Sequence, residues 1–244
     1  MDHRTPEPDE MERGNRQVGR IAAEAVVITA SILLALGVDA WWAGVQDRQA
    51  EQAALIALRL EFLDSRTELF RARDVHVDRC GATAEMRVLL GRAPSELDGD
   101  SLADLMRRMS FVTTVNAPVG ALNSLITSGD LSLILNVGLR SALAGWPERL
   151  ADHRESEDFI FVVVRDQWRP WLIENALIAP SWARTPSPSD SMFDASPLTT
   201  LPTNTQFANM VTAYDSDCEF VMADSETLER DIGDILERIA QDQR

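Results

Sequence analysis

Apolar and polar residues are segregated into a few long blocks along the chain. The most apolar block, residues 21–38, holds eighteen residues with one charge, Glu24, and no proline. At ~1.5 Å per residue, a helix of this length extends about 27 Å, close to the ~30 Å hydrocarbon core of a bilayer. Trp41 and Trp42 follow at once, where aromatic side chains gather at a membrane interface. We therefore predict a transmembrane helix over 17–42 in contact with a lipid bilayer.

The next block, residues 39–90, contains no proline, and its apolar residues recur at helical spacing. We expect the transmembrane helix to run on through it and to end near Gly91–Pro94. One apolar row comprises Leu55, Leu58, Phe62 and Leu69, and beside it lie Ile56, Leu63 and Phe70.

Capping signals divide the following stretch into shorter helices. One helix is expected to begin after residues 98–101, with Ser101 as its N-cap. Another is expected over about 118–128, because Pro118 suits a first helical position. Gly129 is placed to end it in a left-handed conformation.

A long helix is then predicted from Asn136, its N-cap, to about Ala176. Pro147 and Pro170 lie inside it and should kink it. Residues 159–164, FIFVVV, favour a strand by propensity. The flanking helical signals and the lack of partner strands favour a buried helical turn instead.

Residues 177–203 contain five prolines among serines and threonines. Loops of this length are either functional or simply mobile. Because no catalytic group is evident in it, we interpret the segment as a mobile loop.

The last helix has the clearest pattern. Thr203 and Gln206 match a capping box, and one apolar face then continues almost to the C-terminus. Its members are Phe207, Met210, Val211, Tyr214, Cys218, Val221, Met222, Leu228, Ile232, Ile235 and Ile239.

These patterns predict an all-α protein. We expect residues 1–16 to form a disordered cytoplasmic tail and residues 17–42 to form the transmembrane helix. Residues 43–244 should fold as one extracytoplasmic domain, an elongated antiparallel helical bundle with coiled-coil character.

Composition excludes several functions. The chain has a formal net charge of −16, and all 23 of its basic residues are arginine. A surface this negative repels phosphate backbones, so nucleic-acid binding is disfavoured. The absence of lysine also excludes a Walker A loop and a Schiff base in its usual form.

The distribution of arginine sets the expected orientation in the membrane. The N-terminal edge of the apolar block carries arginines with no acid between them, whereas the other edge carries two acids before its first arginine. These residues are Arg13, Arg16 and Arg20 at the first edge, and Asp39, Asp47 and Arg48 at the second. We expect the N-terminus in the cytoplasm. The alternative, a signal peptide cleaved near residues 38–40, is disfavoured by Glu24 and the two tryptophans.

Arg20 and Glu24 lie four residues apart, on one face of the predicted helix. The simpler interpretation is a pair at the inner membrane interface. The alternative is that Glu24 contacts a partner helix, because a charge inside a membrane is costly and usually has a function.

Two blocks of the chain resemble an uncharacterised family of bacterial single-span membrane proteins. The first runs from GRIAAE at residues 19–24 through the apolar run to LGVDAW, which ends at Trp41. The second, residues 122–140, begins LNSLITSGDLSLI. The resemblance implies an inner-membrane anchor and a helical periplasmic domain, but the family has no assigned activity. The chain departs from it in lacking lysine and in placing Trp42 beside Trp41.

Candidate metal ligands are few. His76 and Cys80 have a spacing that zinc can use, but two ligands do not make a site. We favour a core histidine and a core cysteine. His153 lies near Glu155 and Glu157, but such alternate positions do not share a helix face, so we expect a solvated acidic face.

Cys80 and Cys218 are candidates for a disulfide. If the first and last long helices are antiparallel neighbours, Cys80 lies 12 residues below Arg92 and Cys218 lies 15 below Thr203. The mismatch in height is about 4.5 Å. An oxidising compartment permits the bond, but the rotation of each helix about its axis stays open.

No motif points to catalysis. The chain has three histidines and no Gly-x-Ser-x-Gly elbow, and the corner at 127–130 is explained as a helix end. We expect a non-enzymatic, membrane-anchored interaction or scaffold protein without a cofactor, whose partner is a second copy or another membrane protein. The alternative is a periplasmic ligand-sensing domain of the four-helix type; a metal-binding protein or a hydrolase is less favoured.

Overall fold

The computed structural model describes residues 8–175, 192–193 and 195–243, with side chains from Val27 onward except that of residue 196. It divides the chain into two compact units, 1–53 and 54–244, which we describe separately. Every regular element among the described residues is a helix, and these residues contain no β-strand. The all-α prediction is confirmed.

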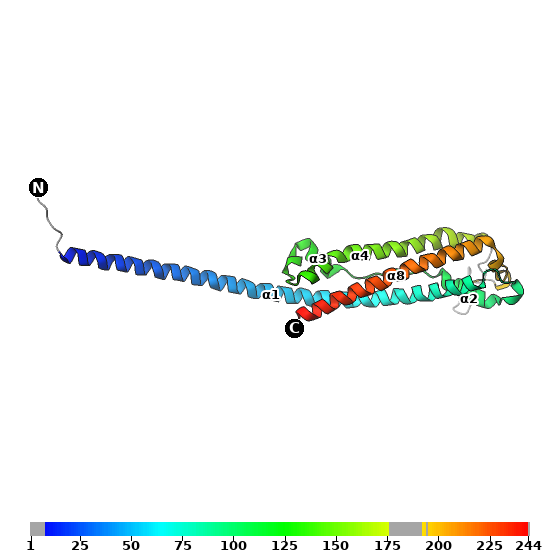
Figure 1. Cartoon of the computed structure of the whole chain (residues 1–244), viewed down its shortest axis with the longest axis horizontal. Helices are drawn as coiled ribbons and strands as arrows, with labels where there is room; N and C mark the ends of the chain where they lie inside the picture. Colours follow the sequence, from blue (N-terminus) through cyan, green and yellow to red (C-terminus); the bar gives the residue numbers. More distant parts are fainter. Residues whose placement is uncertain (1–7, 176–191, 194, 244) are drawn as a thin grey trace. The chain divides into compact units, whose positions relative to one another are not determined.

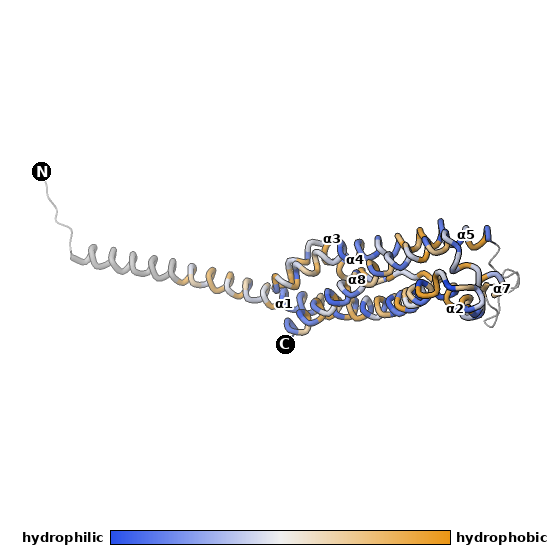
Figure 2. The backbone as a smooth tube through the Cα atoms, turned by 45° about the vertical axis from the view of Figure 1, so that its right-hand side comes forward, coloured by the Kyte–Doolittle hydropathy of each residue, from blue (hydrophilic) through white to orange (hydrophobic). Residues whose placement is uncertain are grey.

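The first unit consists of the beginning of α1, which runs from Pro8 to Leu89. Its side chains from Val27 to Trp42 are exposed. From Val27 onward, α1 includes an 18-residue window with a mean hydropathy of 1.6 and no buried residue, and the beginning of this part is drawn largely in orange and white in Figure 2. By length and composition alone, the helix can cross a membrane.

The start of α1 differs from the predicted tail. The helix includes residues 8–16, which we expected to be disordered; residues 1–7 lie outside the described residues.

In the second unit, α1 contributes residues 54–89, and its predicted inner row is buried. This row comprises Leu55, Leu58, Phe62 and Leu69. The helix ends at Leu89, and Gly91 then has a φ of +78° and donates its N–H to the Pro202 carbonyl at 2.8 Å. This left-handed conformation favours glycine, and the predicted end is confirmed.

α2 runs from Gly99 to Ser110. Its N-cap is Asp98, which accepts a hydrogen bond from the Ser101 N–H at 2.9 Å. The prediction that Ser101 is the cap is therefore wrong. The Asp98 carboxylate also accepts from the Ser101 hydroxyl at 2.6 Å, so Ser101 supports the cap from the first turn.

Residues 111–119 are neither helix nor strand, although Val115 and Ala117 are buried. Side chains from α1 satisfy part of their backbone. Arg71 donates to the Thr114 carbonyl at 3.1 Å, and Ser65 donates to the Pro118 carbonyl at 3.3 Å. A buried non-helical segment persists only where its polar backbone groups find such partners.

α3 runs from Gly120 to Ser128, two residues later than Pro118 predicted. Its first turn is capped from a distance, since the Ala121 and Leu122 N–H groups donate to the Glu61 carboxylate at 2.6 and 3.0 Å. Gly129 has a φ of +82° and ends the helix as predicted.

α4 runs from Val137 to Val163, and Asn136 caps it as predicted, accepting from the Leu139 N–H at 3.0 Å. A π-helical turn, Val164–Trp168, and α5, Arg169–Glu174, continue the chain. The irregularity precedes Pro170, which has no N–H to donate to the preceding turn.

The end of the predicted 177–203 loop has regular structure, so the loop prediction is wrong there. α7 (Ala195–Leu198) and a 3₁₀ turn (Leu201–Thr203) occupy it. Phe193 and Leu198 are buried in a hydrophobic cluster, which holds this part of the segment in place. Residues 176–191 and 194 lie outside the described residues.

α8 runs from Thr205 to Asp242. Its N-cap is Asn204, which accepts from the Phe207 N–H at 3.0 Å, so the predicted capping box at Thr203 is wrong by one residue. The predicted apolar face is confirmed, since from Phe207 to Ile239 its members are buried or half-buried.

Within the second unit, α8 runs antiparallel to both α4 and the last part of α1, as Figure 1 shows. Three ion pairs fix this register: Arg73–Glu229, Arg87–Asp215 and Arg149–Asp231. The three helices enclose two hydrophobic clusters. One includes Phe62 and Trp146, and the other includes Trp168 and Phe207.

Candidate functional site

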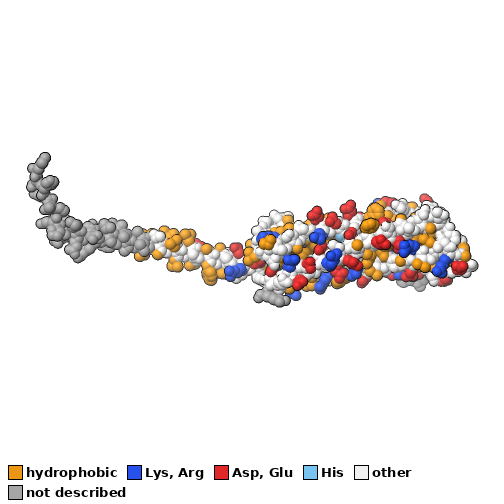
Figure 3. All heavy atoms as spheres, viewed as in Figure 1, with side chains coloured by type: hydrophobic (Ala, Val, Ile, Leu, Met, Phe, Trp, Pro, Cys, Tyr) orange, Lys and Arg blue, Asp and Glu red, His pale blue; other side chains and the backbone are white. Residues whose placement is uncertain are grey.

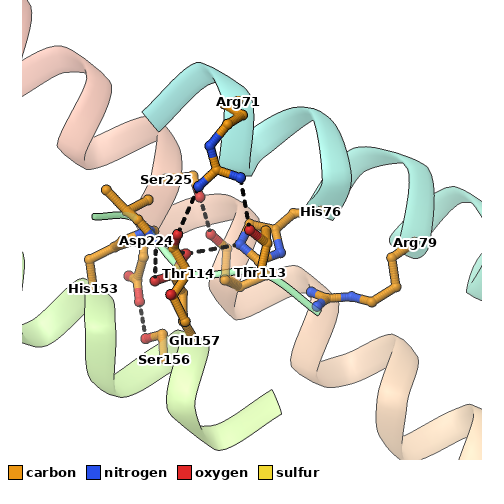
Figure 4. A network of polar contacts seen from close by, with 12 residues as sticks. Arg71, His76, Arg79, Thr113, Thr114, His153, Ser156, Glu157, Asp224 and Ser225 are labelled. Atoms are coloured by element: carbon orange, nitrogen blue, oxygen red, sulfur yellow. Dashed lines mark hydrogen bonds and ion pairs between the residues drawn. The ribbon is translucent and has the colours of Figure 1, made fainter. Parts of the chain in front are cut away.

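A layer of buried polar side chains lies where α1 and α4 face each other. His76 comes from α1, and His153 and Glu157 come from α4; all three are almost fully buried. Figure 4 shows His76 and Glu157 pointing toward one another from the two helices. Buried polar groups require hydrogen-bond partners, so the contacts of each side chain decide what this layer can do.

Glu157 is the acceptor at the centre of the layer. Its Oε1 lies 3.0 Å from His76 Nε2 and 3.5 Å from His153 Nε2. The backbone N–H of Val115, in the extended segment, donates to both carboxylate oxygens at 2.9 and 3.1 Å. One carboxylate therefore connects α1, α4 and residues 111–119.

The contacts fix the protonation of this pair. Burial alone raises the pKa of Glu157, but the neighbouring His153, the hydrogen bond from His76 and the Val115 N–H lower that pKa to about 2. The carboxylate is thus ionised and can only accept, so His76 Nε2 carries the proton that it donates. Burial lowers the pKa of His76, which favours its neutral form.

Arg79 is the second charged group in this region and is also almost fully buried. Its guanidinium carbon lies 5.7 Å from the centre of the Tyr214 ring, and its Nε and Nη1 atoms have no hydrogen-bond partner among the residues that the structure describes. Burial lowers the pKa of Arg79, and the charges of Glu157 and Asp217 oppose that shift. Burial likewise raises the pKa of Tyr214 to about 12.

The layer links α1, α4 and residues 111–119 through Glu157. Two hydroxyls near it have partners outside the layer, since Ser156 bonds Asp224 and Ser225 donates to the Val221 carbonyl. Among the described residues, no group of three or more His, Cys, Asp or Glu side chains is arranged to hold a metal ion.

The predicted disulfide between Cys80 and Cys218 is present. It joins α1 to α8 with a Cα–Cα distance of 5.6 Å, within the range that disulfides require. The rotation of the two helices, which the sequence left open, therefore suits the bond. Because Cys80 is paired with Cys218, its sulfur is not available to bind zinc together with His76.

The predicted membrane-interface residues lie in the first unit. Trp41 and Trp42 are both exposed, and their ring centres lie 6.3 Å apart. Arg20 and Glu24 belong to α1, but their side chains lie outside the described ones, so their pairing stays a prediction.

The interpretation of His153 and its acidic neighbours was wrong. Glu155 is exposed, but His153 and Glu157 are buried. The two are four residues apart and thus share a helix face. Spacing alone could have found this pair, because Leu150, His153, Glu157 and Ile160 repeat at the helical period.

Apolar side chains also gather on the surface of this unit. A cavity of about 170 Å³ opens between α4 and α8. It is lined by Phe159, Val163, Gln167, Trp168, Met210, Ala213, Tyr214 and Asp217, and we call it the α4–α8 groove.

The groove lies near several exposed apolar residues of the same helices. Phe159 is 59% exposed on α4 and Phe220 is 68% exposed on α8. The prediction that residues 159–164 are helical is confirmed. The predicted burial is right for Ile160 and Val164 and wrong for Phe161 and Val162, which are exposed. Figure 3 shows such apolar side chains among charges of both signs.

Comparisons of the chain with protein-family models, with curated proteins and with solved structures find no match.

Proposed function

We propose that this chain is a non-enzymatic, single-pass protein of a bacterial inner membrane whose helical periplasmic domain binds another protein. The proposal includes membership of the uncharacterised single-span family that its sequence resembles. Its N-terminus would lie in the cytoplasm and residues 43–244 in the periplasm.

The anchoring part of the proposal is supported by the exposed apolar side chains of α1. They run from Val27 to Trp42, and fully exposed apolar runs of this length are not stable in water. The Cys80–Cys218 disulfide favours an oxidising compartment for the second unit.

A reporter fusion tests the orientation. Alkaline phosphatase, which is active only in an oxidising compartment, is fused after Arg244 of the full chain. We expect an active reporter and a membrane-bound chain that retains residues 1–38. An inactive reporter, or a mature chain that begins near Trp41, would contradict the proposal.

The observation that carries the binding function is the α4–α8 groove together with the exposed rings beside it. Exposed apolar patches that are rimmed by polar residues mark interaction surfaces, and aromatic side chains dominate the energy of protein interfaces. The buried polar layer adds rigidity to the helices that present this surface.

Photo-crosslinking tests the binding function. A photoreactive phenylalanine analogue replaces Phe220 in the full chain in membranes, and a matched control places it at Glu226, an exposed polar residue of the same helix. We expect a discrete adduct of higher mass from position 220 and none from position 226. Equal labelling at both positions, or none at 220, would count against the groove as a binding surface.

A second candidate function is ligand sensing, favoured by the aromatic lining of the groove. Asp217 and Gln167 would supply its polar contacts. A small ligand would block labelling at position 220 without forming an adduct of protein size, and this outcome separates the two functions.

A further inference from the structure

A second apolar row runs along α1 within the second unit, beside its buried row and on the side turned toward solvent. Ile56 is 55% exposed, Phe70 is 40% exposed and Val77 is 49% exposed, and Leu63 between them is half-buried. We call these four residues the outer row. Leu60 and Val88, 61% and 65% exposed, lie on the same face.

The outer row lies between two flanks of α1 that are occupied by the rest of the unit. On one flank, Arg73 and Cys80 contact α8 through Glu229 and Cys218. On the other flank, Arg71 bonds the segment at Thr114, and Asp78 pairs with Arg108 of α2. The face between these flanks is therefore solvent-exposed.

The spacing of the outer row identifies what could cover it. Ile56, Leu63, Phe70 and Val77 are separated by seven residues at each step. Coiled-coil helices pair along a seam formed by two positions of each seven-residue repeat, and in a parallel pair each layer meets its own copy. The outer row supplies one of these two positions, and Leu60 lies at the other.

We infer that the outer row is the interface of a parallel homodimer, in which α1 of one copy packs on α1 of a second copy. The inference extends the proposed function in one respect, because two chains anchored in the same membrane present α1 in the same direction. The partner is then a second copy rather than the protein bound at the α4–α8 groove.

Charges beside the row fit this parallel arrangement. Arg59 and Asp64 lie on opposite flanks of the seam, five residues apart, where the arginine of one copy meets the aspartate of the other. Neither forms an ion pair with another described residue of its own chain. Arg71, which would otherwise repel Arg66 of the second copy, is held aside by Glu68 at 3.1 Å.

The size of the interface suggests why anchoring matters. Each copy offers only six partly exposed apolar side chains on this face, which is small beside the ~800 Å² per partner of a standard interface. Confinement in a membrane raises the effective concentration of two chains and compensates for a small interface. Asp74 also lies on this face, where two copies of a like charge would weaken the pair.

Cysteine crosslinking of the full chain in membranes tests the dimer. Thr67 is exposed on the outer face, and Thr67→Cys should give a covalent dimer under mild oxidation. The matched control is Glu226→Cys on α8, which should stay monomeric. Adding Phe70→Glu or Val77→Glu to Thr67→Cys should reduce the dimer about tenfold, the ratio for a loss of ~1.4 kcal/mol, and adding Asp74→Leu should increase it.

The native Cys80–Cys218 bond serves as the folding control in each variant, since a folded chain yields no further free thiol from these two cysteines. No dimer from Thr67→Cys, equal dimer from both cysteine positions, or a dimer indifferent to Phe70→Glu and Val77→Glu would overturn the inference. Carbonate extraction of the same membranes tests anchoring separately. A chain that is released by carbonate and still dimerises refutes the anchoring but not the interface.

Discussion

The two faces of α1 in the second unit carry the same kinds of residue, but one face is buried and the other is exposed. On the inner face Leu58, Phe62 and Leu69 are buried against α4 and α8, whereas on the outer face Leu60 and Phe70 are exposed. Removing an apolar side chain from water lowers the free energy, but this requires a second surface against which the side chain can pack. The comparison teaches that a second apolar stripe on a packed helix is evidence of a second partner.

The largest expected difference in unfolding free energy is between a substitution at Phe62 and the same substitution at Phe70. Phe62→Ala should lower the free energy of unfolding by ~3–5 kcal/mol, because it opens a cavity in the core. Phe70→Ala should lower it by less than ~1 kcal/mol. Urea unfolding of the full chain in detergent measures both, and equal effects would remove the distinction between the faces.

Cys80, which forms the disulfide with Cys218, lies on α1 between the buried and the exposed face. Replacing both cysteines, Cys80→Ser with Cys218→Ser, should cost ~2–4 kcal/mol of unfolding free energy, because the bond closes a loop with a sequence separation of 138. Reductant should shift the unmodified chain by the same amount and leave the double variant unchanged. A reductant effect on the double variant would point to another cause.

Acid should weaken the inner face through His76 and Glu157. The pKa of His76 is lowered in the folded chain, so the unfolded chain takes up a proton first. The unfolding free energy should therefore fall as the pH drops below about 6.5, by up to ~1.4 kcal/mol per pH unit. The pKa of Glu157 is about 2 rather than 4.5, so the stability that it contributes is complete above pH 4.5 and is lost toward pH 2.

Urea unfolding at a series of pH values measures this loss. His76→Gln keeps a donor for Glu157 without a titrating ring and should flatten the curve between pH 6.5 and 5. A curve for the unmodified chain that is already flat in that range would contradict the role given to His76, which faces Arg79, His153 and Glu157.

The smallest effect is expected at Val77, the last residue of the outer row. Val77→Ala should change the unfolding free energy of the dispersed chain by less than ~0.5 kcal/mol, since about half of this side chain is exposed. Differential scanning fluorimetry at low protein concentration suffices. A loss above ~1.5 kcal/mol would show that the outer row is packed inside the unit after all.

Local signals in the sequence were enough to predict the long helices. The apolar face of α8 repeats at 3.6 residues, and Gly129 ends α3 because few other residues adopt its conformation cheaply. The caps at Asp98 and Asn204 were missed by one to three residues, since neighbouring polar residues compete for the same role. The disulfide was a candidate because two helix ends set the heights of both cysteines, whereas the rotation of the helices could not be derived from the sequence.

The remaining features depend on contacts between distant segments. The start of α3 is fixed by Glu61, and the burial of Val115 depends on Glu157, so no local sequence pattern predicts either feature. The burial of Phe193 and Leu198 similarly depends on the cluster that receives them. The His153–Glu157 pair is different, because its four-residue spacing is visible in the sequence. The prediction failed because it grouped Glu157 with Glu155 as one acidic face.

The hydrogen bond from Val115 to Glu157 makes one amide a natural spectroscopic probe of the whole second unit. An N–H shared between both oxygens of a buried carboxylate should resonate far downfield and exchange its hydrogen slowly. Both properties vanish when α1 and α4 separate or when Glu157 takes up a proton. A single resonance therefore reports both the packing of α1 on α4 and the protonation of Glu157, without any label being added to the chain.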